Sequence, residues 1–166
     1  FGLRKKGRQR YREFLKETFE VIREQVEAKH LIVDVRFNEG GYIGHDATLF
    51  SYLAQEPFRE NESAIAKLID IPLEKYQDKK EFFKGVEKAI EKSLAKEFKK
   101  APDGLFHLID EKNKLSQPKR FGFKGHIYIL TSGWTHSGGA VVCSMALNND
   151  NVTFIGQETG GGHEYY

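Results

Sequence analysis

The sequence predicts an α/β fold in which helices cover a sheet of buried strands. Two kinds of pattern support this prediction: amphipathic stretches with helical spacing, and short apolar runs that fit buried strands. They follow one another in the order helix, strand, helix, insert, strand, helix, strand, which is typical of α/β domains. A chain of 166 residues is long enough for one sizeable core, so we expect a single domain.

The first part of the chain predicts a helix, a strand and a second helix. From about residue 5 to residue 29, apolar residues recur every three or four positions and form one helical stripe: Tyr11, Leu15, Phe19, Ile22 and Val26. The apolar, β-branched run at 31–36 fits a buried strand. A glycine-rich loop then precedes a helix near residues 46–55, for which Asp46 is the expected N-cap.

The middle of the chain, between Pro57 and Pro118, has a weaker pattern. Helical spacing there predicts a third helix that ends at Ala101 and Pro102, through Phe83, Val86, Ile90, Leu94 and Phe98. Residues 105–109 fit a short strand.

The last part of the chain predicts a strand at 126–131, a turn at 133–139, an apolar helix at 140–147 and a strand at 152–155. Because the three strongest strand patterns are apolar runs flanked by turns, we expect Val33, Ile129 and Ile155 to be buried.

Composition narrows the classes of partner. The formal charge is only +2, from 26 basic and 24 acidic residues, which argues against nucleic-acid binding. No apolar run is long enough for a membrane span, so we expect no membrane insertion of this chain. The histidines show no metal-ligand spacing and no phosphate-binding G-x-x-x-x-G-K motif is present, so we expect no metal and no cofactor.

Two glycine-flanked turns carry the chemistry, since each follows a strand and precedes a helix. In the turn Thr135-His-Ser-Gly-Gly139, such placement would expose Ser137 as a nucleophile beside backbone N–H groups at a helix N-terminus. Taken alone, the pattern is a weak signal, and a serine that only caps the helix is the simpler interpretation. The second turn is at 34–41.

Three segments together resemble the tail-specific (C-terminal processing) serine peptidases, peptidase family S41. Asp34-Val-Arg-Phe-Asn-Glu-Gly-Gly41 is similar to the family's D-x-R-x-N-x-G-G segment, and 133–139 is similar to its nucleophile turn. Phe154-Ile-Gly-Gln-Glu-Thr-Gly-Gly161 is similar to its strand ending in G-x-x-T-x-G. Three motifs in family order are much more specific than any one of them.

The resemblance implies peptide-bond hydrolysis through an acyl-enzyme on Ser137. The oxyanion hole would be formed by the N–H groups of Gly138 and of Gly41, or alternatively Gly40. We then expect the two turns to meet, while Asp34, Arg36 and Asn38 hold the loop that presents the glycines. The implied fold is a layered sheet-and-helix core of the ClpP/crotonase type. Substrates would be polypeptides, in many relatives bound through the C-terminus, and relatives in bacteria are commonly exported to the cell envelope.

The general base is where the sequence departs from the family. Glycine stands at Gly162, where the serine–lysine members carry their lysine, so the chain resembles the tricorn-like branch, in which an upstream histidine is the base. No such segment precedes residue 31, and His163 and His136 are the weaker candidates within the chain.

The chain opens on Phe1 and closes on a glycine-rich run, so we expect a partial catalytic domain without a PDZ domain in residues 1–166. Without its base, the fragment is expected to be inactive. Two alternatives remain: a non-catalytic ligand- or peptide-binding module of the same fold, and a crotonase-like acyl-CoA enzyme.

Overall fold

The fold was analysed in a computed structural model, which describes residues 5–25, 28–41, 44–60, 63–69, 94–109 and 114–161. The chain divides into two compact units where the sequence predicts one domain. The main unit comprises Phe1–Glu60 and Leu115–Tyr166, and the inserted unit comprises Asn61–Lys114. The mixture of helices with parallel and antiparallel strands confirms the predicted α/β class.

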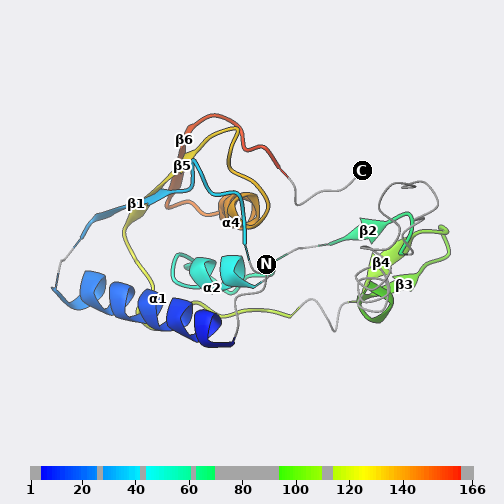
Figure 1. The fold of residues 1–166 in the computed structure, drawn as a ribbon, viewed down its shortest axis with the longest axis horizontal. Helices are drawn as coiled ribbons and strands as arrows, with labels where there is room; N and C mark the ends of the chain where they lie inside the picture. The colour runs from blue at the N-terminus through cyan, green and yellow to red at the C-terminus, as the bar shows by residue number, and fades with distance from the viewer. Residues whose placement is uncertain are drawn as a thin grey trace. The chain divides into compact units, whose positions relative to one another are not determined.

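The main unit contains a three-stranded parallel sheet in the order β1-β5-β6 (Figure 1). The strands are β1 (His30–Asp34), β5 (His126–Thr131) and β6 (Val152–Gly156), all within one or two residues of their predicted bounds. Ile129 pairs with Val33 on one side and Phe154 on the other. Because the strands are parallel, both predicted turns leave the sheet at the same edge.

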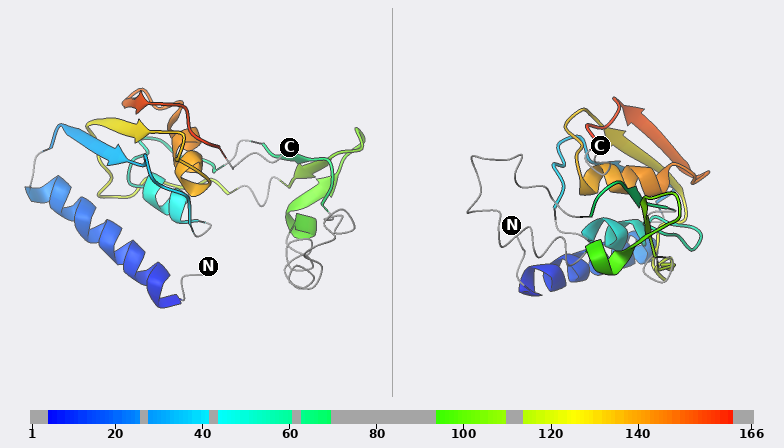
Figure 2. Two further views of the ribbon diagram at one scale, coloured as in Figure 1. Left: turned by 45° about the horizontal axis from the view of Figure 1, so that its top comes forward. Right: turned by 90° about the vertical axis from the view of Figure 1, so that its right-hand side faces the viewer.

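The helices in the described residues of this unit are α1 (Lys5–Gln25), α2 (His45–Phe50) and α4 (Gly138–Ala146). Figures 1 and 2 show α4 next to the sheet, α2 below α4, and α1 on the far side of α2. The predicted N-cap of α2 is wrong, because Gly44 takes that position in the left-handed conformation, with φ 86°. Asp46 instead lies in the first turn, where its carboxylate accepts a hydrogen bond from Ala47 N at 2.8 Å.

A single apolar core lies between the sheet and the helices. It is formed by Leu15, Phe19, Val35, Phe50, Tyr52, Leu53, Ala54, Phe123, Ile127, Ile129, Val142, Cys143 and Ala146. Ile129 is fully buried as predicted, and Val33 is half-buried against the core. The prediction for Ile155 is wrong, since its side chain is 49% exposed. Alternate side chains of a strand face opposite ways, so β6 directs Phe154 to the core and Ile155 to the other face.

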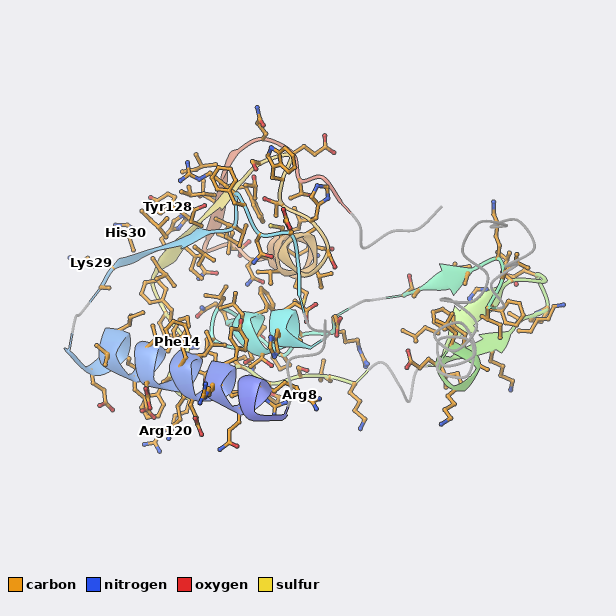
Figure 3. All side chains as sticks on the ribbon, in the orientation of Figure 1. Arg8, Phe14, Lys29, His30, Arg120 and Tyr128 are labelled. Atoms are coloured by element: carbon orange, nitrogen blue, oxygen red, sulfur yellow. The ribbon has the colours of Figure 1, made fainter. Side chains whose placement is uncertain are left out.

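That other face of the sheet carries a group of aromatic rings. The centroids of His30 and Tyr128, both labelled in Figure 3, are 5.8 Å apart, and His126 lies 4.9 Å from Tyr128. Ile32 is exposed beside them. The described helices therefore bury one face of the sheet and leave apolar groups on the other.

Truncating Ile129 tests this assignment of faces. We expect Ile129→Ala to lower the free energy of unfolding by about 2–5 kcal/mol, because it opens a cavity in the core. The matched variant Ile155→Ala removes the same atoms from the exposed face and should cost less than about 1 kcal/mol. Denaturant unfolding of both variants measures the difference, and equal costs would contradict the observed orientation of β6.

The inserted unit contains an antiparallel sheet in the order β2-β4-β3, formed by β2 (Ile65–Ala66), β3 (Phe98–Lys100) and β4 (Phe106–Leu108). Strand β4 confirms the strand predicted at 105–109. Phe98, predicted to be helical, instead begins β3, because pairing with Leu108 gives its backbone sheet partners. Phe83, Val86 and Ile90 lie outside the described residues.

Candidate active site

Ser137 lies between β5 and α4, where the sequence predicts a nucleophile. It is the N-cap residue of α4, yet its side chain makes no capping hydrogen bond. Its backbone has φ 49° and ψ −121°, the one positive φ at a described residue other than glycine. Such a conformation costs roughly 1–3 kcal/mol and persists where the surrounding structure holds it in place. A serine serving only as a cap would need no such strain.

The two predicted turns meet at Ser137. A methyl group placed on Gly40 would lie 2.5 Å from Ser137 Cβ and 2.9 Å from Ser137 Oγ, so only glycine fits there. Gly40 also has φ 98°, which favours glycine independently. A methyl group on Gly138 would lie 3.8 Å from Gly41 N. The predicted approach of the glycine turn to Ser137 is therefore confirmed.

Asn38 anchors the glycine turn to the serine turn. Its side-chain Oδ1 accepts a hydrogen bond from Gly40 N at 2.8 Å, and its carbonyl oxygen accepts one from His136 N at 2.8 Å. Gly139 approaches so closely that a methyl group there would lie 3.2 Å from Asn38 Oδ1. Asn38 thus holds the glycine loop, as predicted.

Thr135 provides a second anchor, which the sequence analysis did not single out. Its side chain is fully buried, and Thr135 Oγ1 donates to Val35 O at 2.8 Å and accepts from Ser132 N at 3.1 Å. The sequence feature that could have indicated this anchor is a threonine two residues before the candidate nucleophile. Its hydroxyl ties the end of β1 to the turn that follows β5.

Asp34 and Arg36 form a bidentate ion pair at the base of the glycine turn, with distances of 3.0 and 2.7 Å. Hydrogen bonds from the Arg36 side chain, and then from Arg36 N, lower the pKa of Asp34 to about 2. The Asp34 carboxylate is therefore charged at neutral pH. The pair stabilises the start of the turn, consistent with the predicted structural role.

The backbone N–H groups near Ser137 differ in their availability. Gly40 N already donates to Asn38 Oδ1. Within the described part of the chain, Gly41 N and Gly138 N donate to no acceptor. Two free N–H groups beside a serine hydroxyl are the arrangement that stabilises an oxyanion.

Comparison with known proteins assigns the family. The model of peptidase family S41 matches residues 3–165. The chain belongs to peptidase family S41. No curated protein matches the chain.

A solved structure shares the fold of this S41 chain. It is described as mature CPAF complexed with lactacystin, and it matches with a TM-score of 0.52 at 14% sequence identity. The match covers 93% of this chain and 34% of the CPAF chain. This S41 chain therefore spans about a third of the length of that protein.

A general base is not evident beside Ser137 in the described part of the S41 chain, where Ser137 Oγ makes no hydrogen bond. The His136 ring packs against the loop after β6, where a methyl group on Gly160 would lie 2.6 Å from His136 Nε2. His163 and Gly162 lie outside the described residues. An acidic neighbour was missed by the sequence analysis: Asp46 Cβ would lie 3.9 Å from a methyl group on Gly138.

Other features of the described residues lie apart from this site. A cavity of about 590 Å³ opens between α1, α2 and the segment 116–119, and its lining includes neither Ser137 nor the glycine turn. No group of three or more potential metal ligands occurs among the residues that the structure describes. None of the helices described is both long and apolar enough to cross a membrane.

Proposed function

We propose that this chain forms part of the active site of a serine-type endopeptidase that works through an acyl-enzyme. Ser137 Oγ attacks the carbonyl carbon of a peptide bond while a base takes its proton. The N–H groups of Gly138 and Gly41 hold the resulting oxyanion, the amine leaves with a proton, and water then releases the acyl group. The observation that carries this proposal is the strained Ser137 beside two free N–H groups.

The availability of N–H groups favours Gly41 over Gly40 as the second donor. Gly40 N is occupied by Asn38 Oδ1, so Gly40 serves by its lack of a side chain and Gly41 by its N–H. Each well-placed donor contributes on the order of 3 kcal/mol to lowering the barrier. Gly40 becomes the second donor only if its bond to Asn38 is released.

The base in this proposal comes from outside the chain, as in the tricorn-like branch, and His163 or His136 is the alternative within it. Residues 1–166 then form part of an S41 catalytic core. The substrate in this proposal is a polypeptide that binds through its C-terminus.

The proposal is tested by labelling with a fluorophosphonate, which reacts with activated serines. We expect labelling of a longer protein that contains this chain, and loss of labelling in Ser137→Ala. A matched variant, Ser144→Ala, removes a hydroxyl from helix α4 outside the two turns and should remain labelled. If Ser137 is not labelled in any form of the protein that binds peptides, the protein is a non-catalytic binding module. The second candidate function is supported by one observation: the Ser137 hydroxyl makes no hydrogen bond to a base in the described residues.

A further inference from the structure

Two large aromatic side chains project from the turns that carry Ser137 and Gly40. Phe37 is 79% exposed and Trp134 is 65% exposed. Both follow the carboxyl ends of neighbouring parallel strands, β1 and β5. Each lies three residues before the position at which the turns touch, Gly40 or Ser137. Neither side chain belongs to the core, so the fold gains little from their being aromatic.

Hydrogen bonds on either side of Phe37 hold its segment against the turn that carries Trp134. Arg36 O, just before Phe37, accepts a bond from Ser132 Oγ, and Asn38 O, just after it, accepts one from His136 N. Trp134 lies between Ser132 and His136 in the sequence, and its backbone N–H donates to Ser132 Oγ at 3.1 Å. These bonds join the segment that carries Phe37 to the turn that carries Trp134.

We propose that Phe37 and Trp134 form an apolar cradle that binds one large apolar side chain of the polypeptide substrate. This inference rests on the proposed function and names the side-chain class that the site prefers. Three residues of extended chain reach at most about 11 Å. The bound side chain therefore lies within about three residues of the scissile bond.

The chemistry of the cradle favours an aromatic or branched aliphatic side chain. Both rings are exposed in the chain, so an apolar side chain placed between them removes apolar surface of all three from water. A polar side chain there would lose hydration and gain no hydrogen-bonding partner from either ring. In a hydrophobic pocket, a difference of one methylene group between two substrates changes their relative kcat/KM by about 10–200-fold.

Trp134 is the only tryptophan of the chain, so its fluorescence reports directly on the cradle. The experiment uses the 166-residue chain with Ser137→Ala, which excludes turnover, and two flexible Gly/Ser peptides that differ by Phe or Ser at one central position. We expect the Phe peptide to shift Trp134 emission to shorter wavelength and to bind at least about tenfold more tightly. Phe37→Ala should abolish this preference. The matched control Leu147→Ala, an exposed apolar residue at the other end of α4, should retain it.

Equal affinity for the two peptides, or a preference that survives Phe37→Ala, would overturn the proposal. Fluorophosphonate labelling distinguishes failure of the cradle from failure of the proposed function, because the label reacts with Ser137 without occupying the cradle. A labelled Ser137 without an apolar preference contradicts the cradle alone. An apolar preference without labelling of the longer protein supports the cradle and contradicts the proposed peptidase activity.

Discussion

Replacing Gly40 with alanine is expected to slow the reaction of Ser137 by about a hundredfold or more. The added methyl group would lie 2.5 Å from Ser137 Cβ and 3.1 Å from Gly138 N, so the two turns must move apart. A displacement of about 1 Å in an active site can cost about 10²-fold in rate. The rate constant for fluorophosphonate labelling, in a form of the protein that reacts, measures this loss.

Gly133→Ala is the matched control, because a methyl group there meets open space within the same turn. It should leave the labelling rate unchanged. Circular dichroism and thermal unfolding of Gly40→Ala establish that the variant is folded. A folded Gly40→Ala protein that is labelled at the original rate would show that the contact between the turns does not position Ser137.

Hydrolysis of an unstructured peptide by the 166-residue chain alone is expected to be very slow. Ser137 Oγ has no hydrogen-bonding partner in the described part of the chain, and the sequence resemblance predicts that Gly162 stands where serine–lysine members carry their lysine. In well-studied serine proteases, removing the base costs on the order of 10⁶-fold in kcat. Peptide cleavage by the chain, compared with its Ser137→Ala variant, is the measurement.

Robust cleavage that depends on Ser137 would place the base within these 166 residues. His163→Ala and His136→Ala would then identify it, since only the variant that lacks the base should lose activity. His126→Ala is a suitable control, because that ring lies on the outer face of the sheet and contacts Thr153 at 2.8 Å. No loss in either test variant would direct attention to Asp46, near Gly138.

The sheet and the meeting of the two turns were predictable from the sequence. Strands β1, β5 and β6 are apolar runs flanked by turns, and their pattern is strong because their inner residues are buried. The three motifs, through the family resemblance, predict that the turn of Gly40 meets the turn of Ser137. This expectation comes from the family resemblance, whose three motifs each lie at the carboxyl end of a strand.

Other features depend on tertiary contacts that no local pattern records. The alternation of side chains along β6 exposes Ile155, although its neighbour Phe154 is also apolar and packs against the core. The inserted unit has strands of only two or three residues, too short for a period to be recognised. The free N–H of Gly41 and the bond from Gly40 N to Asn38 Oδ1 likewise follow from the folded turn, which a sequence pattern alone does not resolve.

The close approach of Gly40 to Ser137 links the two positions in evolution. Residues in contact tend to co-vary, and here any side chain at position 40 would occupy the space of Ser137 Oγ. A lineage that keeps the serine must also keep the glycine. A lineage that has lost the serine is released from that constraint, so other residues should accumulate at position 40 only there, marking descendants that no longer cleave peptides.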